Sequence, residues 1–373
     1  GVFASSVATD LSSAFHSDIP DYDVVYSAAN KTLSLSVPAH RDHCVCAGEA
    51  VYVGDHIGCS TITDWIAWGD DDAEKTTLPT ESGNYYLESD VNLAKVHYFS
   101  KDATITICLN GHTVKGLSKK TLAFMELGTV LNITDCGEGG KFVSTSTTYA
   151  GVFYMYEDST LNLYAGKLDA SAAPPPSSGT SKYYTIVMFC DDRDKNGTRL
   201  PAFINMYGGE IVGRVDNDCT KDVGAVYIGV SGSEFNMYGG YITGGAGKSG
   251  GAIMATNTVT LNLRGGIITG NRGPAGAIYA NTKVKITLGG RIRIIGNTNT
   301  DGTAEINLFR PASANEITIA QLADALIGLS LTDKGVFAQN VDTDVSGMFV
   351  PDDSSLIVVY DEEAKTLSIQ ESN

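Results

Sequence analysis

The chain has 373 residues, including 41 glycines and 18 tyrosines, and its formal net charge at neutral pH is −17. This acidic balance leaves no basic stripe to neutralise phosphates, which excludes nucleic acid as a partner and disfavours an anionic membrane surface. No apolar run approaches the ~20 residues of a membrane-spanning helix. Because glycine and tyrosine are abundant and basic residues are scarce, we expect an exported, all-β protein.

The first and last segments of the chain are copies of each other. The segment from Gly335, GVFAQNVDTDVSGMFVPDDSSLIVVYDEEAKTLSIQ, aligns without a gap on the segment from Gly1, GVFASSVATDLSSAFHSDIPDYDVVYSAANKTLSLS. Roughly half of the aligned positions are identical, which predicts one period of a tandem array whose partners are neighbouring copies of the same module. Residues 1–38 are then the closing segment of a preceding module, acting as a cap here, and residues 313–373 close this module. Two unrelated β-hairpins of similar composition are the alternative.

A Cys/His-rich stretch, residues 39–80, follows the first copy and is interpreted as an adaptor. A structural zinc site needs four nitrogen or sulfur ligands on a compact stretch of chain. The candidate ligands here are Cys44, Cys46, His56 and Cys59, with His43 as an alternate. The first two cysteines are spaced more closely than in most zinc knuckles. A disulfide from Cys59 to one of them, or free thiols, is the alternative.

A second, shorter repeat fills residues 81–312. Its clearest copies read FINMYGGEIVG, FNMYGGYITGG, LNLRGGIITGN and ITLGGRIRIIG, and starts are about 25 to 32 residues apart, with one longer interval. Each copy has an alternating apolar strand, a Gly-rich corner, a second strand, a turn and a third strand. Three short strands per period fit a right-handed parallel β-helix better than a propeller blade. We predict that one inward residue per copy stacks along the axis: Leu131, Leu161, Ile204, Phe235, Leu261 and Ile286.

Several of these runs carry a family resemblance. HCVCAGEAVYVGDHIGC (43–59), then DWIAW, YYLESDVNL, ICLNGHTV, ITDC and the Gly-Gly-rich copies, resemble right-handed β-helix repeat regions of large surface proteins from gut-dwelling Gram-positive bacteria. The resemblance covers nearly the whole chain and implies an adhesin-like protein at the bacterial cell surface, outside the cell. Because β-helices also carry lyases, hydrolases and phage spikes, it implies more about fold than about function.

Four further cysteines follow the period of the repeat. Cys108 and Cys136 lie about one period apart, as do Cys190 and Cys219. Adjacent coils are ~4.8 Å apart, within the range that a disulfide tolerates. Two disulfides suit an extracellular protein, and buried thiols in a ladder are the alternative that we favour. The segment Ile319–Gly328, IAQLADALIG, is the one stretch expected to form a short helix or helical turn.

The longest interval between copies offers a candidate active site. Two carboxyls ~5–9.5 Å apart on neighbouring coils could act as a glycosidase pair, and carboxylates with loop carbonyls could bind Ca²⁺. The candidates are Asp191, Asp192, Asp194, Asp216 and Asp218. These residues are also ordinary turn residues, and the chain lacks the Gly-His-Gly that polygalacturonase-like β-helix enzymes place after their Asp pair. Catalysis is therefore the alternative hypothesis.

Aromatic residues recur near the expected corners of the coils. The candidate ligand-binding residues are Tyr183, Tyr184, Tyr207, Tyr238 and Tyr279. Flat rings stack on sugar rings, so a tyrosine-lined groove would bind glycans, but the same rings can instead stack on each other and stabilise the coils. Trp65 and Trp68 are expected to anchor the N-terminal segment on the first coil.

The sequence therefore favours a repeat module of a bacterial surface adhesin or stalk without catalysis, which projects from the cell and contacts host or dietary glycans. The alternative is a carbohydrate-active enzyme, either a polysaccharide lyase or a glycoside hydrolase, that uses the Asp residues of the long interval. Comparing modules separates the two, because an Asp loop that varies between modules argues against catalysis.

Overall fold

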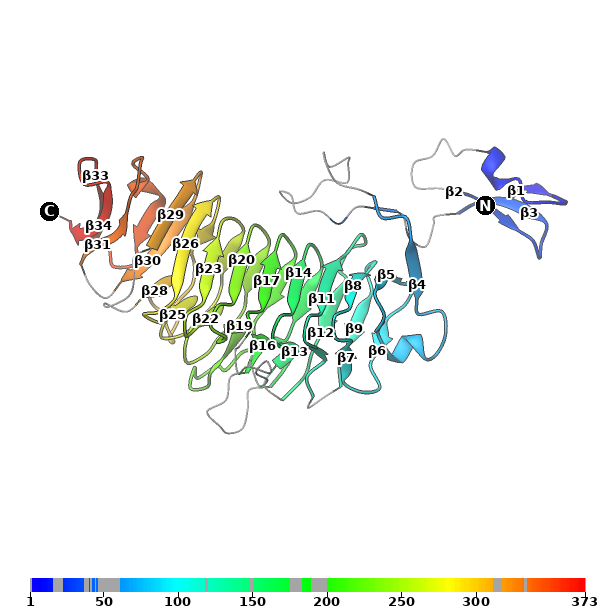
Figure 1. Ribbon diagram of the computed structural model, residues 1–373, viewed down its shortest axis with the longest axis horizontal. Helices are drawn as coiled ribbons and strands as arrows, with labels where there is room; N and C mark the ends of the chain where they lie inside the picture. Colours follow the sequence, from blue (N-terminus) through cyan, green and yellow to red (C-terminus); the bar gives the residue numbers. More distant parts are fainter. Residues whose placement is uncertain are drawn as a thin grey trace. The chain divides into compact units, whose positions relative to one another are not determined.

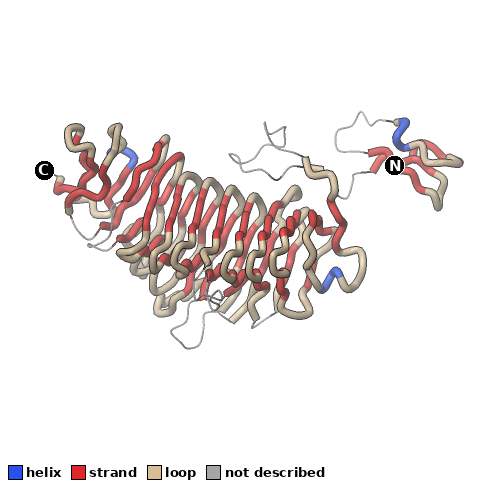
Figure 2. Tube along the Cα trace, viewed as in Figure 1, coloured by secondary structure: helices blue, strands red, loops and turns tan. Residues whose placement is uncertain are grey.

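The computed structural model describes residues 2–15, 23–36, 40, 42–43, 45, 61–117, 120–147, 150–174, 183–188, 200–310, 317–331 and 334–372. It divides into two units, Gly1–His43 and Cys44–Asn373, each described by itself below. Among these residues nearly every element is a strand, which confirms the expected all-β class (Figure 2). The helical elements of the described part are single 3-10 turns: η1 (Ser12–Ala14), η2 (Glu74–Thr76) and η3 (Ser346–Met348). No helix in these ranges has the length and apolar character needed to cross a membrane.

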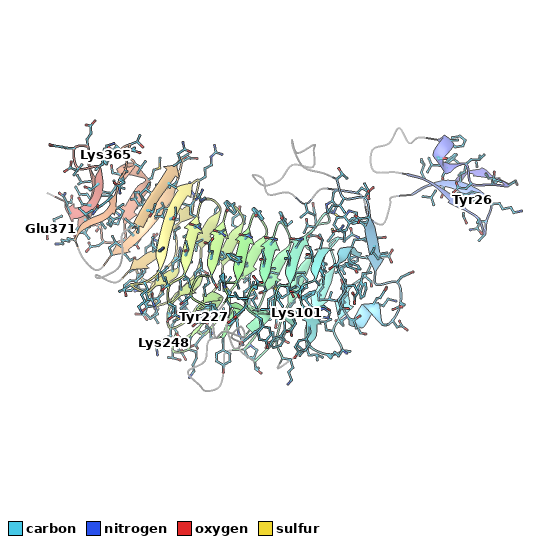
Figure 3. All side chains as sticks on the ribbon, in the orientation of Figure 1. Tyr26, Lys101, Tyr227, Lys248, Lys365 and Glu371 are labelled. Carbon is cyan, nitrogen blue, oxygen red and sulfur yellow. The ribbon has the colours of Figure 1, made fainter. Side chains whose placement is uncertain are left out.

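The first unit is a small antiparallel sheet. Its strands, in the spatial order β1, β3, β2, are β1 (Val2–Ser5), β2 (Asp23–Ser27) and β3 (Thr32–Ser36). The Tyr26 hydroxyl, labelled in Figure 3, donates to the carbonyl of Val7 at 3.0 Å. Phe3 and Phe15 meet edge to face, with 5.8 Å between their ring centroids.

The second unit consists mainly of three ladders of parallel strands (Figure 1). The first ladder contains β4 (Trp65–Trp68), β5 (Gly83–Leu87), β8 (Thr104–Cys108), β11 (Val130–Thr134), β14 (Thr160–Leu163), β17 (Phe203–Met206), β20 (Glu234–Met237), β23 (Thr260–Leu263), β26 (Lys285–Gly290) and β29 (Ile317–Leu322). The second contains β6 (Val91–Asn92), β9 (Thr113–Lys115), β12 (Lys141–Val143), β15 (Lys167–Asp169), β18 (Glu210–Val212), β21 (Tyr241–Thr243), β24 (Ile267–Thr269) and β27 (Arg293–Ile294). The third contains β7 (His97–Phe99), β10 (Ala123–Met125), β13 (Ala150–Met155), β16 (Tyr183–Met188), β19 (Val223–Ile228), β22 (Ile253–Ala255), β25 (Ile278–Ala280) and β28 (Leu308–Arg310).

From β5 to β29 the chain visits the three ladders in the same order in every period. The second and third ladders converge on β30 (Leu326–Leu331), which pairs with both β27 and β28 and then with β32 (Phe349–Pro351). An antiparallel sheet closes this end, with β31 (Gly335–Gln339), β34 (Thr366–Glu371) and β33 (Leu356–Asp361) in that order. The architecture is therefore long parallel sheets, which is compatible with a solenoid.

Alternation of apolar and polar residues explains why these segments form half-buried strands, since successive side chains point to opposite faces. In the first ladder Leu131 pairs with Leu161 in register, and Leu161 with Ile204. All the expected inward residues of this ladder are buried and lie in register: Leu131, Leu161, Ile204, Phe235, Leu261 and Ile286. Full burial of one such side chain stabilises a fold by roughly 1.5–3 kcal/mol, so this stack is a main source of stability.

The Gly-rich corners follow from backbone geometry. At the corner after β20, Gly240 has a φ of +82°, a conformation that L side chains rarely adopt. An added Cβ at this position would lie 2.6 Å from the carbonyl oxygens of Gly208 and Gly209 in the preceding period. The corner therefore needs glycine both for its dihedral angle and for the close stacking of periods.

A row of asparagines runs along the outer face of the first ladder. Its members, here called the asparagine row, are Asn132, Asn162, Asn205, Asn236 and Asn262. Each side-chain amide donates to the asparagine oxygen of the preceding period at 2.7–2.9 Å, and Asn132 donates to Thr106 at the start of the row. The row links neighbouring periods by side-chain hydrogen bonds in addition to the backbone ladder.

One prediction of secondary structure is wrong. Ile319–Gly328 was expected to form a helix or helical turn, yet it spans the end of β29, a turn at Asp324 and the start of β30. The alanines and leucines of this segment favour a helix in isolation. However, β29 pairs in parallel with β26 and β30 pairs in parallel with β27, and this pairing overrides the helical preference.

The tryptophans stand at the other end of the first ladder. Trp65 is the first residue of β4 and Trp68 is the last, and this strand pairs in parallel with β5. The Trp68 indole donates a hydrogen bond to the carbonyl of Thr77 at 3.1 Å. They are thus part of the terminal strand of the ladder.

Candidate functional site

The third ladder carries a row of outward aromatic and apolar side chains, of which the sequence patterns singled out Tyr279 alone. The parallel register aligns one residue from each strand, and this set is here called the outer row: Tyr98, Phe124, Tyr154, Val187, Tyr227, Met254, Tyr279 and Phe309. Figure 3 labels Tyr227 on β19. The signal was present in the short strands YMY, AVYIG and AIYAN, where an aromatic residue alternates with inward aliphatic ones.

The outer row is exposed at one end and buried in its middle. Tyr98 is 51% exposed and stacks on Phe124 with a centroid separation of 5.0 Å and an interplanar angle of 9°. Tyr154, Tyr227 and Met254 are buried and form a second apolar cluster outside the inner core. The accessible aromatic surface of the row therefore lies around Tyr98.

Tyr184 belongs to this second cluster and corrects one expectation for the ligand-binding set. Its side chain is fully buried, and its hydroxyl donates to Met254 Sδ at 3.2 Å. Burial raises the pKa of Tyr184 well above its ordinary value. A ring enclosed in this way offers no face to a glycan, so Tyr184 stabilises the packing of neighbouring periods.

Two of the predicted tyrosines stack on each other at the corner that follows the first ladder. Tyr207 lies between Tyr164 and Tyr238, with centroid separations of 4.8 and 5.2 Å and interplanar angles of 17° and 8°. We call these three residues the corner stack. Both faces of Tyr207 are covered, whereas Tyr238, at the end of the stack, is 44% exposed. Of the two predicted rings, Tyr238 is the one open to a ligand.

The remaining two predicted tyrosines are partly buried. The Tyr183 ring packs against Arg214, with the guanidinium carbon 5.6 Å from its centroid, and the Tyr279 ring stacks on Phe309 at 6.2 Å. Arg214 itself is fully buried and donates from Nη2 to the carbonyls of Ser146 (2.6 Å) and Pro174 (3.0 Å). Burial lowers the pKa of Arg214 to about 10. The two hydrogen bonds from Arg214 Nη2 therefore link its own turn to turns of two preceding periods.

The predicted carboxylates fall into two groups. Asp191, Asp192 and Asp194 lie outside the described residues. Asp216 is buried, and its Oδ2 accepts hydrogen bonds from the backbone amides of Thr220 and Lys221, each at 2.7 Å. A carboxylate that satisfies backbone amides in this way shapes a turn. Asp218, two residues further along the chain, is exposed.

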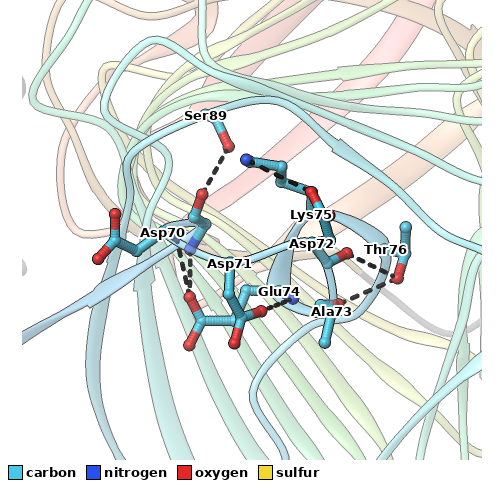
Figure 4. Close-up of polar contacts among 9 residues, drawn as sticks. Asp70, Asp71, Asp72, Ala73, Glu74, Lys75, Thr76 and Ser89 are labelled. Carbon is cyan, nitrogen blue, oxygen red and sulfur yellow. Dashed lines mark hydrogen bonds and ion pairs between the residues drawn. The ribbon is translucent and has the colours of Figure 1, made fainter.

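A separate acidic turn between β4 and β5 shows the same use of carboxylates (Figure 4). Glu74 Oε2 accepts from the amides of Gly69 (2.9 Å) and Asp70 (3.0 Å), while Asp71 Oδ1 accepts from the amide of Glu74 (2.8 Å). Lys75 lies 3.8 Å from Asp72. Two of these side chains are thus engaged in closing the turn around η2.

Four of the predicted zinc ligands, Cys44, Cys46, His56 and Cys59, lie outside the described residues. The alternate ligand His43 is described and lies in the first unit, where its Nε2 is 3.2 Å from that of His40. Imidazole nitrogens are common zinc ligands, and a closed structural zinc site needs two further ligands besides these two histidines.

The cysteines of the second unit bear on the choice between disulfide and ladder. Cys108 Sγ and Cys136 Sγ are 3.2 Å apart across adjacent periods, a thiol contact longer than the ~2.05 Å of a disulfide. The contact with Cys136 and burial raise the pKa of Cys108 above its ordinary value. Cys219 is a buried free thiol, and Cys190 lies outside the described residues.

No family model, curated protein or solved structure matches this chain.

Proposed function

We propose that this chain is a repeat module of an elongated adhesin-like protein at the bacterial surface, in which a right-handed parallel β-helix acts as a stiff stalk. The observation that carries the proposal is the unbroken in-register stacking of the first ladder from β5 to β26. Strand–crossover–strand connections between parallel strands are almost always right-handed, which gives the coil its proposed hand. Each period adds one strand spacing to the length and contacts only its neighbours.

A duplication tests the stalk directly. One full period, residues 234–259, begins at β20 and ends before β23, and its insertion after residue 259 adds a matched copy of every stacked position. We expect each added period to lengthen the second unit by about 4.8 Å at constant cross-section, measured by small-angle X-ray scattering of chains with one, two and four extra periods. A cross-section that grows with each insertion would show that the periods do not stack as coils.

Glycan contact is the adhesive part of the proposal, and the exposed rings of Tyr98 and Tyr238 are its candidate surfaces. Stacking on a sugar ring needs an open aromatic face, so Tyr238→Ala should weaken binding on a glycan array. Tyr207→Leu is the matched control, since both faces of that ring are covered. Equal binding by the Tyr238→Ala variant and the parent chain would place the contact elsewhere.

Absence of catalysis is tested on the same sample. Incubation with a panel of plant and host polysaccharides should release no reducing ends and no unsaturated sugars. Release that is abolished by Asp192→Asn, or by Asp218→Asn, would replace the stalk proposal with the lyase or hydrolase alternative.

A further inference from the structure

The two copies of the terminal repeat adopt the same fold in detail. In both, a strand with a register irregularity pairs with the last strand, at Val2/Ala4 in the first copy and Val336/Ala338 in the second. The 3-10 turn η3 repeats η1, and Tyr360 donates to Val341 at 3.0 Å as Tyr26 does to Val7. The equivalence of the two copies is therefore structural as well as sequential.

The edge-to-face phenylalanine pair is also repeated. Phe3 and Phe15 lie 5.8 Å apart at 67°, and their counterparts Phe337 and Phe349 lie 5.5 Å apart at 68°. A pair conserved in this geometry presents the same apolar face of the small sheet in both copies. What covers that face in one copy is thus a guide to what covers it in the other.

In the second copy the face is covered by the end of the solenoid. Phe349 begins β32, which pairs with β30 through Ile327 and Phe349, and β31 contacts β29. Phe337 is only 7% exposed and Phe349 only 5%. Both belong to the same apolar core as the inward residues of the three ladders.

Polar contacts complete this junction. The Asp352 carboxylate accepts from the Asn307 side-chain amide at 2.7 Å and from the Asn307 backbone amide at 2.8 Å. Ser330 of β30 donates to the same carboxylate. Asn307 continues a buried line of asparagines, because Asn297 donates to it at 2.9 Å. The closing segment thus covers the apolar side chains of the last coils and hydrogen-bonds to their polar groups. Without it, the last strands would present an open edge.

In the first copy the equivalent face is open. Phe3 is 48% exposed and Phe15 is 49% exposed, and Leu11, the counterpart of the buried Val345, is 46% exposed. Among the described residues of the first unit, Leu33 is the one buried apolar side chain. Three neighbouring large apolar residues that are buried in the twin copy are thus exposed here.

We infer that the face formed by Phe3, Leu11 and Phe15 docks onto the last coil of a preceding copy of the solenoid, in the way that Phe337, Val345 and Phe349 cover β29 and β30. The occupant is a solenoid end that leads directly into residues 1–36, because the solenoid end of this chain is already covered by residues 335–372. The inference rests on the proposed function as a repeat module. It adds the surfaces through which consecutive modules join rigidly.

A tandem chain tests this junction. Residues 44–334 are placed before Gly1 of the full chain, so that residues 1–36 follow a solenoid end as residues 335–372 do. Phe3→Cys is introduced at the junction, and Phe337→Cys at the distal end is the matched control. Trypsin releases the two sites in the peptides 1–31 and 335–365, neither of which contains a native cysteine. Maleimide labelling of each peptide is followed by mass spectrometry.

In the single chain, we expect the thiol from Phe3→Cys to react about tenfold faster than the thiol from Phe337→Cys, because only the second is buried. In the tandem chain, the rate at Phe3→Cys should fall to the rate at Phe337→Cys. Persistent fast labelling at the junction, with slow labelling at the distal site, would overturn the docking inference and leave the stalk proposal standing. Sugar release in the polysaccharide assay would instead overturn the stalk proposal, whatever the labelling shows.

Hydrogen exchange on the unsubstituted chains gives a second measurement that no substitution can disturb. Amides of residues 2–15 should exchange more slowly in the tandem chain than in the single chain, while amides of residues 336–349 should exchange equally in both. Equal exchange of residues 2–15 in the two chains would also overturn the inference.

Discussion

His97 shows how one buried side chain ties the stability of the fold to pH. The ring lies at the start of β7, packs edge to face on Phe99 with centroids 4.5 Å apart, and is buried. Burial, opposed by a backbone hydrogen bond with Pro79 and assisted by the nearby charge of Lys95, lowers the pKa of His97 from 6.5 to about 4. The imidazole is therefore neutral in the folded chain where an exposed histidine would already be protonated.

The sign of the effect follows from proton uptake. Between pH 6.5 and about 4 the unfolded chain binds a proton at His97 and the folded chain does not, so stability is full above pH 6.5 and falls as the pH falls to 4. The loss is roughly 3 kcal/mol. His97→Leu should remove this component, so its thermal midpoint should fall less than that of the parent chain between pH 7.5 and pH 4.

His112→Leu is the control, because that ring is only partly buried. The three chains share every other ionisable residue, so the difference between variants isolates the histidine. If His97→Leu and the parent chain lose the same stability over this pH range, the buried ring does not titrate as described.

Individual site residues were the least predictable part of the chain. Tyr184 lies at the start of β16 and Tyr238 directly after β20, yet Tyr184 is enclosed by a second apolar cluster and Tyr238 is open to solvent. The sequence favoured Asp216 as a turn residue and left a catalytic role as the alternative, and the structure shows its carboxylate accepting from the turn amides. Sequence spacing placed these residues near corners, but which faces are covered depends on neighbours that are distant in the chain.

Among the elements, the asparagine row allows a test of how neighbouring periods are linked. Asn236 donates to Asn205 and accepts from Asn262, so Asn236→Ala removes two hydrogen bonds and leaves two partners unmatched. We expect a loss of about 2 kcal/mol in the free energy of unfolding, measured by urea denaturation. Asn262→Ala removes the one bond that Asn262 donates within the row and should cost about half as much.

The comparison of the two variants decides whether hydrogen bonds between the asparagine side chains stabilise the fold. No effect at either position would show that the row contributes nothing beyond the backbone ladder, and equal losses at Asn236 and Asn262 would show that the loss does not follow the number of hydrogen bonds removed. The two positions share residue type, strand position and outward direction, so the contrast between the variants reports the number of hydrogen bonds removed.

Strand positions were more predictable than the segment that ends the ladders. The alternating copies around Ile204, Phe235 and Leu261 form strands in register as expected. Ile319–Gly328 was read as helical because its alanine, leucine and glutamine favour a helix, whereas pairing with β26 and β27 makes it two strands. Local preference fails where the partner strands already exist and present unpaired backbone groups.

The stability of the whole second unit depends on the antiparallel sheet of β31, β34 and β33 that closes it. Phe337 is buried against the last strands of the ladders, so Phe337→Ser should destabilise the second unit by about 3 kcal/mol or more. The same change at the equivalent position, Phe3→Ser, should shift the main unfolding transition little in the single chain, because Phe3 is half exposed there. Differential scanning calorimetry of the two variants measures the contrast.

Equal shifts for Phe3→Ser and Phe337→Ser would show that the two copies contribute alike to the stability of this chain. A small shift for Phe337→Ser would show that the closing sheet does not protect the end of the ladders. Either result would contradict the distinction between a covered and an open face.

The all-β class, the repeat and the inward stack follow from the sequence alone, because period-two alternation and Gly-rich corners are local signals that recur in every copy. The similarity of the terminal segments likewise predicted that they share one fold, as their matched strands and phenylalanine pairs show. The outer row, the covered face of Phe337 and the open face of Phe3 required the three-dimensional structure. Whether a side chain is buried is decided by contacts between strands of different periods or of the closing sheet, and no local pattern records those contacts.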